Sequence, residues 1–428
     1  MNAKIKAMLK RNRLFMRFFN KYRNHLPINP MADKISIPEI TPFSPTQATS
    51  KNRINLIVPS INQEHVFGGI STALKFFSEL GENLQYDIRI ILTDATPAQS
   101  DIDRIGTYFP SAATRKTSIE IFPYNDRYQK EIGVSENDVF VATAWWTAYN
   151  AYKTMEWQEE TFGFCRPLVY LIQDYEPGFY SWSGKYALAY GTYRSRFDTF
   201  AVFNSSFLGD YFSKNDLRFS KSFVFEPRLN SVLAEKLNER RGQVVKEKLI
   251  LLYGRPSVER NAFSLIIEGL KVWVWKQPDA KEWKIISAGE SHPGVDLGNG
   301  CVVTSVGKVT IEEYSDLLSR ASVGVSLMIS PHPSYPPMEM AVYGACVITN
   351  GYGNKNLSKW HDNIVSIDNI SPEKLSEALR TACDDTRADA QRFIDGKLKH
   401  PEYRSTKDQF GFMSELTDSI RKSSERDH

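Results

Sequence analysis

Short runs of aliphatic, β-branched and aromatic residues alternate with helix-length segments through most of this chain, and few folds accept such a pattern. The first two runs, Ile54 to Ile61 and Asp87 to Leu92, flank an amphipathic stretch that opens at two glycines, Gly68 and Gly69. Alternation of this kind is typical of βαβ units, in which a crossover helix joins two parallel strands. We therefore predict an α/β fold with a parallel, doubly wound sheet.

The alternation stops in a strongly polar segment, residues 230–248, and restarts with an apolar run from Leu249 to Tyr253. A chain of 428 residues is long enough for two separate cores. We therefore predict two Rossmann-like domains that face each other across a cleft. The expected organisation is a basic arm at 1–25, a Pro-rich linker at 26–50, an N-terminal domain at 51–245, a C-terminal domain at 246–400, and a C-terminal helix within 401–428 that can return to the N-terminal domain.

The net charge of +3 hides an uneven distribution. Of the 53 Lys and Arg residues, eight lie in the first 23 residues, which contain no acid, so the rest of the chain carries 45 basic against 50 acidic residues. Apolar residues of the arm recur at steps of three and four, which predicts an amphipathic helix on an anionic membrane surface. A disordered basic tail and a segment that packs on a partner subunit are the alternatives.

No stretch approaches the ~20 apolar residues of a spanning helix, and no secretory signal is recognisable. The four cysteines, Cys165, Cys301, Cys346 and Cys383, are far apart in the sequence, which favours reduced thiols. We therefore expect a cytoplasmic protein that lies on the inner face of the cell membrane. No nucleic-acid-binding module accompanies the arm, so no nucleic-acid partner is expected. A homodimer is an open alternative to a monomer.

Three places in the second half, each directly after a predicted strand, carry groups that suit an anion. Gly254 and Arg255 end one strand, Arg260 begins the following helix, and Lys308 follows another strand. A guanidinium fork can hold two phosphate oxygens, and a lysine adds a point charge. The third place is a loop at 330–337 that runs into a helix start. Each signal alone is typical of a surface ion pair, but together they indicate a phosphate site.

One set of these residues resembles the donor domain of the retaining glycosyltransferases of the GT-B fold. The set comprises Gly254, Arg255, Arg260, Lys308, the segment Glu339 to Ala345 and the strand Cys346 to Asn350. The resemblance covers most of the chain from Lys51 to about Pro401. Segments 173–177 and 333–339 are most similar to WsaF-type rhamnosyltransferases, which use dTDP-rhamnose in building bacterial S-layer glycans.

The resemblance implies a nucleotide-sugar donor, dTDP-β-L-rhamnose, and transfer of rhamnose to a lipid-linked, rhamnose-containing cell-surface glycan with retention of configuration. It assigns Arg255 and Lys308 to the departing diphosphate, as catalytic residues, and Glu339 to the hydroxyls of the nucleotide's ribose or deoxyribose. The expected donor-binding residues are Gly68, Gly69, Gly254, Arg255, Arg260, Lys308, His332, Ser334, Tyr335 and Glu339.

The acceptor is expected at the segment that follows the strand Leu168 to Ile172 in the first half. Ring faces pack on the C–H surfaces of sugars and carboxylates accept hydroxyl protons, so acidic groups among aromatic rings suit a glycan. Asp174 or Glu176 is the base if the enzyme inverts; if it retains, the donor phosphate takes the proton and Asp174, the third catalytic residue, orients the sugar. The expected acceptor-binding residues are Gln173, Asp174, Glu176, Tyr180 and Trp182.

Two positions depart from the family pattern. The first glutamate of the family motif falls at Pro331, and the histidine of the first domain falls at about Gln173. A 6-deoxy sugar has fewer hydroxyls to hold, which makes the first loss tolerable.

No metal ion or other cofactor is expected. The one Asp-x-Asp match, Asp101 to Asp103, lies in a polar stretch that predicts a solvated turn rather than a buried strand end. Arg255, Arg260 and Lys308 can supply the positive charge that a divalent ion supplies elsewhere.

Two other functions fit the predicted architecture. Nucleotide-sugar 2-epimerases rely on several carboxylates and histidines, of which the second half has few. A non-catalytic glycan-binding scaffold is the other alternative, and the presence of Arg255, Lys308 and Glu339 argues against it.

Overall fold

The computed structural model describes residues 37–49, 52–63, 69–109, 119–127, 130–239, 245–405 and 407–423. The predicted basic arm lies outside the described residues, and so does Gly68 of the predicted donor site.

The described end of the Pro-rich segment is part of the folded chain. Ser44–Gln47 forms strand β1, which pairs in parallel with β5 (Glu131–Val134) in a two-stranded sheet. Pro45 is tolerated because a strand at a sheet edge has backbone groups that need no ladder partner. Phe43 is buried, with its ring centroid 5.4 Å from that of Tyr124. The folded part of the chain therefore begins earlier than residue 51.

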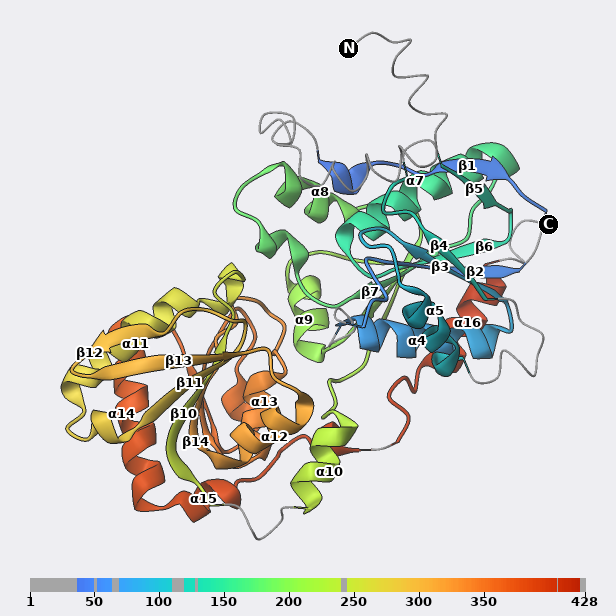
Figure 1. Ribbon diagram of the computed structural model, residues 1–428. Coiled ribbons are helices and arrows are strands. Elements are labelled where there is room, and N and C mark those ends of the chain that lie inside the picture. The colour runs from blue at the N-terminus through green and yellow to red at the C-terminus, as the bar shows by residue number, and fades with distance from the viewer. Residues whose placement is uncertain are drawn as a thin grey trace. The chain divides into compact units, whose positions relative to one another are not determined.

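The first of two large sheets has seven parallel strands (Figure 1). In spatial order they are β4 (Ile119–Pro123), β3 (Asp87–Leu92), β2 (Arg53–Val58), β6 (Asp138–Ala142), β7 (Leu168–Ile172), β8 (Thr199–Phe203) and β9 (Lys221–Val224). The chain winds outward in one direction from β2 and in the other from β6, as in a doubly wound fold. The helices of this part are α4 (Gly69–Leu84), α5 (Gln99–Ile105), α7 (Trp145–Phe162), α8 (Gly184–Thr192) and α9 (Ser206–Lys214).

The second sheet repeats this plan with one antiparallel strand added at its edge. Its order is β12 (Val295–Gly298), β13 (Cys301–Gly307), β11 (Lys284–Gly289), β10 (Glu247–Gly254), β14 (Ala321–Val325), β15 (Cys346–Asn350) and β16 (Ile364–Ile367). The helices that follow the first sheet are α10 (Ser231–Glu239), α11 (Phe263–Lys276), α12 (Ile311–Arg320), α13 (Pro336–Val342), α14 (Pro372–Ala388), α15 (Ala390–Ile394) and α16 (Met413–Lys422). The predicted fold class, two doubly wound Rossmann-like domains, is confirmed.

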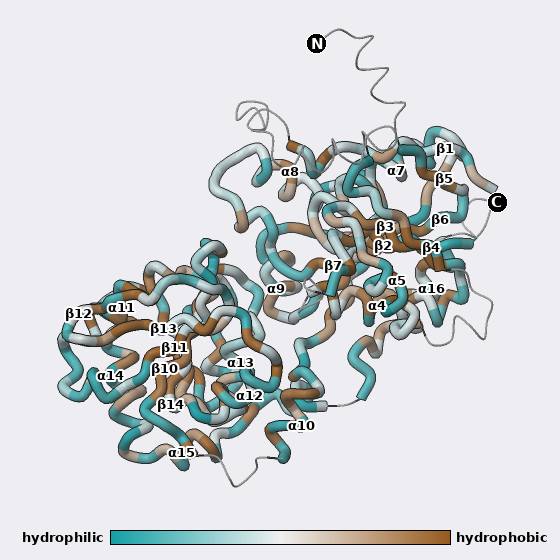
Figure 2. The backbone as a smooth tube through the Cα atoms, in the orientation of Figure 1, coloured by the Kyte–Doolittle hydropathy of each residue, from teal (hydrophilic) through white to brown (hydrophobic). Residues whose placement is uncertain are grey.

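Both faces of each sheet carry a core, which explains why the central strands are apolar along their whole length. Every residue of β6, β7 and β8 is buried. Along β2 the side chains alternate, since Leu56 and Val58 join the core on one face and Ile57 joins the core on the other. Figure 2 shows brown concentrated in the central strands of both sheets, whereas α5 and α14 carry much teal.

The chain ends against the first domain. Helix α16 packs on α4, and its residues Met413, Leu416 and Ile420 share a core with α4 and β2. Phe410, just before the helix, places its ring centroid 5.4 Å from that of Phe76 on α4. The segment expected as one C-terminal helix is a short 3₁₀ turn, Pro401–Arg404, followed by α16.

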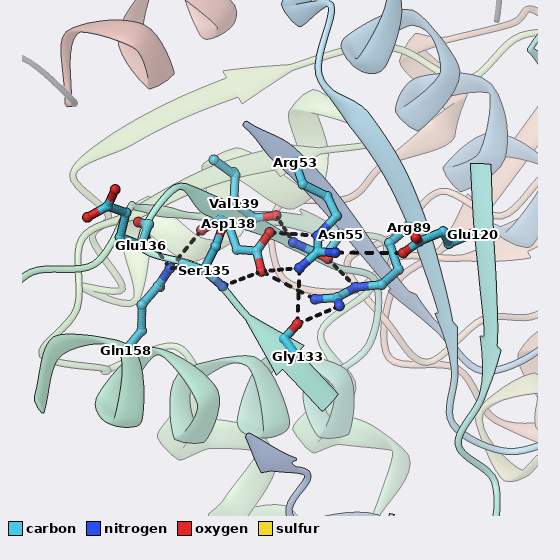
Figure 3. A network of polar contacts seen from close by, with 10 residues as sticks. All are labelled: Arg53, Asn55, Arg89, Glu120, Gly133, Ser135, Glu136, Asp138, Val139 and Gln158. Atoms are coloured by element: carbon cyan, nitrogen blue, oxygen red, sulfur yellow. Dashed lines mark hydrogen bonds and ion pairs between the residues drawn. The ribbon is translucent and has the colours of Figure 1, made fainter. Parts of the chain in front are cut away.

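A buried ionic network ties together the amino ends of the central strands of the first sheet (Figure 3). Asp138, the first residue of β6, is completely buried and accepts two hydrogen bonds of 2.8 Å from Arg53, the first residue of β2. Arg89 of β3 lies 3.4 Å from the same carboxylate and donates to Asn55 at 2.6 Å. The backbone N–H of Ser135 completes the carboxylate's partners at 3.0 Å. Because the network sits away from the carboxyl ends of the strands, we interpret it as structural.

Replacing Asp138 should be costly. Asp138→Ala leaves the guanidinium groups of Arg53 and Arg89 without their shared buried counter-charge, and we expect a loss of about 3–5 kcal/mol in the free energy of unfolding. Urea unfolding measures this loss. The control Glu268→Ala removes one partner of an exposed pair with Lys271 on α11, which should cost less than about 1 kcal/mol. Equal losses in the two variants would contradict a structural role for the network.

Candidate active site

The predicted site residues gather where parallel sheets place their ligands. Gln173 and Asp174 directly follow β7, Arg255 directly follows β10, Lys308 follows β13, and the loop at 326–335 follows β14. All of these strands are parallel within their sheets, so each sheet presents its residues along one edge.

Asp174, in the first domain, contacts polar side chains of the second domain. It is only 7% exposed. The hydroxyl of Ser330, in the loop after β14, donates to its Oδ1, and the backbone N–H of Tyr175 donates to the same atom at 2.8 Å. Nε of Arg260 lies 3.6 Å from Oδ2. The structure therefore brings the predicted acceptor-side carboxylate to the predicted donor-side arginine.

Arg260 is held from several sides. It lies in a short 3₁₀ turn, Glu259–Asn261, between β10 and α11, and the next residue, Ala262, has a left-handed backbone with φ of 48°. Its guanidinium carbon stands 4.1 Å above the centre of the Phe179 ring, and its carbonyl accepts from the N–H of Ile329 at 2.7 Å. These contacts orient Arg260 toward Asp174 before any ligand is present.

The loop after β14 fixes the protonation state of His332. Its ring Nδ1 accepts a hydrogen bond of 3.0 Å from the backbone N–H of Ser334, and the backbone N–H of His332 donates to the hydroxyl of Ser330 at 3.1 Å. Burial lowers the pKa of His332 to about 4, so the ring is neutral at pH 7 and carries its proton on Nε2. This Nε2–H is buried and has no hydrogen-bond partner among the described residues. His332 is therefore a donor available to a ligand.

Glu339 lies in the first turn of α13, as expected, but its surroundings were not predicted. The hydroxyl of Tyr314 on α12 donates to its Oε2 at 3.0 Å. Burial raises the pKa of Glu339 to about 7, although the hydrogen bond from Tyr314 opposes the shift. Tyr335 stands just before α13, with its ring centroid 5.9 Å from that of His332. Burial also raises the pKa of Tyr335, whose hydroxyl has the side chain of Thr72 on α4 as a hydrogen-bond neighbour.

Gly254 owes its identity to packing between strands. A Cβ at this position would collide with the side chain of Ser287 on β11. The hydroxyl of Ser287 lies 2.8 Å from Nε2 of His292, so it is already engaged. Gly254 therefore lets β10 and β11 end close together, and Arg255 projects from that point, partly exposed.

Lys308 is the most distant of the predicted donor residues along the second sheet. It is exposed at the end of β13, which is separated from β10 by β11. Two strand spacings put the ends of β13 and β10 roughly 10 Å apart. A ligand that touches both Arg255 and Lys308 must therefore be extended along the edge of the sheet.

In the first domain, α4 begins against the predicted acceptor segment. A Cβ on Gly69 would come within 2.7 Å of Oε1 of Gln173, so the start of the helix lies close to this side chain. Oε1 of Gln173 is buried and has no partner among the described residues. This amide is a second polar group available to a ligand.

Two other predicted acceptor residues accept hydrogen bonds from Trp145, which is completely buried. Glu176, 8% exposed, accepts from the backbone N–H of Trp145, and the hydroxyl of Tyr180 accepts from its indole N–H at 2.8 Å. Trp182 differs from both, since it is 91% exposed. Glu176 and Tyr180 therefore have a clear structural role, and Trp182 does not.

The sequence analysis did not identify Lys355 as a site residue. It is 1% exposed and donates to the carbonyl of Met328 at 2.6 Å, which supports the loop after β14. Burial lowers its pKa to about 7, and the charge of Asp174 opposes the shift. The signal that could have found Lys355 is its place five residues after the end of β15.

The Asp-x-Asp match was misinterpreted. Asp101 and Asp103 lie in α5, not in a solvated turn, and Asp101 is 8% exposed. Its carboxylate accepts from the N–H groups of Ala98 at 3.1 Å and Gln63 at 2.9 Å, so it caps the helix. Within the part of the chain that the structure describes, no three His, Cys, Asp or Glu side chains are grouped as metal ligands would be.

Two doubly wound domains with polar groups at their strand ends place this protein in the GT-B class. The fold is similar to that of a mutant of S. aureus TarM in complex with Fondaparinux, alpha-GlcNAc-glycerol and UDP, with a TM-score of 0.51 and 9% identity over 87% of this chain and 99% of that one. It is also similar to WaaG, described as a glycosyltransferase involved in lipopolysaccharide biosynthesis, with a TM-score of 0.49 and 13% identity over 86% of this chain and 99% of that one.

The family is defined by sequence. Residues 53–206 match the family model of the WsaF N-terminal domain, and residues 248–380 match that of the WsaF C-terminal domain. The chain belongs to the WsaF family. It is also 31% identical over 249 residues to the O-antigen biosynthesis protein RfbC of Myxococcus xanthus, a match that covers 57% of this chain and 18% of that protein. The chain thus matches less than a fifth of the length of this relative.

The buried carboxyl of Glu176 predicts a pH-dependent stability. Burial raises its pKa from 4.5 to about 8, so its ionised form is disfavoured by folding and it costs stability as the pH rises from about 5 to 8. Glu176→Gln should therefore stabilise the protein relative to wild type at pH 9, by on the order of 1–3 kcal/mol, and have little effect at pH 5. Thermal melts at the two pH values measure the difference.

The matched control is Glu373→Gln. Hydrogen bonds at the start of α14 lower the pKa of Glu373, so this variant should gain no stability as the pH rises. A gain in the control equal to that of Glu176→Gln would contradict the burial argument.

Proposed function

We propose that this chain is a glycosyltransferase that transfers a deoxyhexose, rhamnose from dTDP-β-L-rhamnose, to a rhamnose-containing, lipid-linked cell-surface glycan. The observation that carries the proposal is the contact of Asp174, which follows β7, with Arg260, which follows β10, and with Ser330, which follows β14. Membership of the WsaF family and the name of the RfbC relative, which refers to O-antigen biosynthesis, support a glycan product. The first domain would hold the acceptor and the second the donor.

The leaving group sets the first chemical requirement. As the sugar departs, negative charge collects on the nucleoside diphosphate, and the protein must stabilise it. Arg255 and Lys308 follow β10 and β13, whose ends are two strand spacings apart, and Arg260 is already oriented by Phe179. The Nε2–H of His332 has no partner among the described residues. These groups suit the charge of a diphosphate, so we propose that transfer needs no metal ion.

The engagement of Asp174 favours one of its two expected roles. Its carboxylate already accepts from the hydroxyl of Ser330 and the N–H of Tyr175, and Arg260 lies beside it. A carboxylate held on both oxygens suits orientation of the sugar and stabilisation of a cationic anomeric carbon better than proton transfer. We therefore propose the retaining course, in which a donor phosphate oxygen takes the acceptor proton.

The proposed place of action is the cytoplasmic face of the membrane, where a lipid-linked acceptor would be extended. None of the described helices combines the length and the hydropathy needed to cross a bilayer. In this proposal the basic arm holds the protein at the anionic surface. The arm lies outside the described residues, so the proposal rests on its sequence alone.

Nucleotide selectivity tests the proposal against its alternatives. In a thermal-shift screen of dTDP, UDP and GDP, run in excess EDTA, we expect dTDP to raise the melting temperature most, because a ligand that binds only the folded state stabilises it. Stabilisation by UDP alone would favour a 2-epimerase, and no stabilisation would favour a non-catalytic scaffold. Loss of the dTDP effect in EDTA, with recovery on adding Mg²⁺, would contradict metal independence.

The role of Glu339 predicts a pH-dependent affinity. Its carboxylate would accept from the single free hydroxyl, the 3′-hydroxyl, of the thymidine sugar. Because its pKa is raised to about 7, the free protein holds this acceptor in the ionised form only above that pH. Glu339→Gln should weaken dTDP binding at pH 8 by about 10- to 100-fold, as for a hydrogen bond to a charged group, and by less at pH 6. Calorimetric titration at both pH values measures the change.

The control for this experiment is Tyr314→Phe, which removes the hydroxyl that donates to Glu339 and leaves the carboxylate in place. Because that hydrogen bond lowers the pKa of Glu339, the variant should approach the wild-type affinity for dTDP as the pH rises above 8, whereas Glu339→Gln should not. The titration of the ligand's own phosphate is common to all variants, so the difference between wild type and Glu339→Gln isolates the carboxyl group. Equal affinities of these two proteins at pH 8 would show that Glu339 does not contact the nucleotide.

A further inference from the structure

A row of three aromatic rings runs along one side of α8 and the turn before it. Trp182 is 91% exposed, and its ring centroid lies 5.2 Å from that of Tyr186. The rings of Tyr186 and Tyr190 are stacked, with centroids 6.4 Å apart and planes within 8° of each other. Tyr186 and Tyr190 are four positions apart on α8, which puts them on the same side of the helix, and Trp182 lies just before its N-cap, Ser183. We call the three aromatic residues the α8 row.

The α8 row is continuous with the candidate active site. The ring centroid of Tyr175 lies 6.2 Å from that of Tyr193, the C-cap residue of α8, and Tyr175 and Tyr190 pack against the same hydrophobic core. Tyr175 directly follows Asp174 and donates its N–H to that carboxylate. On its other side, Tyr175 lies 5.2 Å from the ring of Tyr211, which lies 6.1 Å from that of Tyr352. The α8 row and the residue beside Asp174 therefore belong to one aromatic region of the first domain.

The packing of the fold does not account for Trp182. Trp145 is completely buried and holds Glu176 and Tyr180 in place, whereas Trp182 presents nearly its whole surface to solvent. An indole in this position adds little to the stability of the core. Its ring and the two phenols beside it offer flat apolar faces edged by hydroxyl groups.

The chemistry of the row fits a carbohydrate better than a membrane or a protein. Sugar rings present C–H faces that pack on aromatic rings and hydroxyls that pair with phenols. Insertion into a bilayer needs a broad apolar face, but α8 has the sequence GKYALAYGT, in which Ala189 is buried and only Leu188 is a large aliphatic residue. The two basic side chains nearby lie over rings, Lys185 over Tyr180 and Arg194 over Tyr190.

We propose that Trp182, Tyr186 and Tyr190 bind several sugar units of the acceptor glycan at a distance from its reacting end, which lies at Asp174. This inference rests on the proposed function and deepens it, because it assigns residues to the part of the acceptor glycan that lies beyond its reacting sugar. An enzyme with such a row binds longer acceptors more tightly, since each added sugar gains a ring contact. The row thereby favours extension of an existing chain over its initiation.

The test measures binding of the full chain to α-L-rhamnose oligosaccharides, from the monosaccharide to the hexasaccharide, by calorimetry without donor. For wild type we expect the affinity to rise with length. Trp182→Ala and Tyr186→Ala should each weaken binding of the hexasaccharide by about 3- to 10-fold and leave binding of the monosaccharide unchanged. Tyr186→Phe keeps the ring and should lose less than Tyr186→Ala.

The matched control is Trp275→Ala, which removes the indole of α11, 72% exposed and in the second domain. It should bind every oligosaccharide as wild type does. An affinity that does not depend on length in wild type, or a hexasaccharide affinity unchanged in Trp182→Ala, would overturn the inference. So would a result in which Trp182→Ala lowers only the binding to phosphatidylglycerol vesicles, or only self-association.

The assignment of the donor is tested independently of the α8 row. Stabilisation by dTDP is measured without oligosaccharide, and the length series is measured without nucleotide. A protein that binds dTDP but shows no dependence on length would refute the α8 row alone, whereas dependence on length without any effect of dTDP would refute the donor alone.

Discussion

The buried carboxylate of Asp138 holds the amino ends of the central strands of the first sheet, and the candidate site at their other ends depends on that order. Arg53 of β2 and Arg89 of β3 converge on Asp138 of β6, so three adjacent strands share one ionic network. Buried charges are tolerated only when they are paired, so this network admits little rearrangement. Polar groups at the carboxyl ends, Asp174 among them, are therefore presented on a rigid edge.

Burial then sets the charge of the site residues. It keeps His332 neutral with its proton on Nε2, and it raises the pKa of Glu339 and lowers that of Lys355 until both lie near 7. Outside the first 23 residues the chain has more acidic than basic groups, so bulk attraction does not bring an anionic donor to the site. In the proposed function local groups do so, above all Arg255 and Arg260.

Much of the fold was predictable because its central strands are buried on both faces. The apolar residues of β6 and β7 are nearly continuous and every one is buried. The edge strands β4, β9 and β12, in each of which at most one residue is buried, were missed. The role of Asp101 was misinterpreted because a polar stretch can form either a turn or the start of a helix. The hydrogen bonds that its carboxylate accepts from two backbone N–H groups show that it caps a helix, and the sequence does not reveal them.

The amino-acid sequence was enough to specify two doubly wound sheets and to place polar residues at their strand ends, because hydrophobic periodicity and strand-end position are local properties. Which of those residues meet was decided by tertiary packing. Ser330 donates to Asp174 across 156 positions of sequence, and the side chain of Lys355 became visible as a site group only once its burial was known. Contacts of this kind depend on how distant segments pack, and no local pattern of residues encodes that.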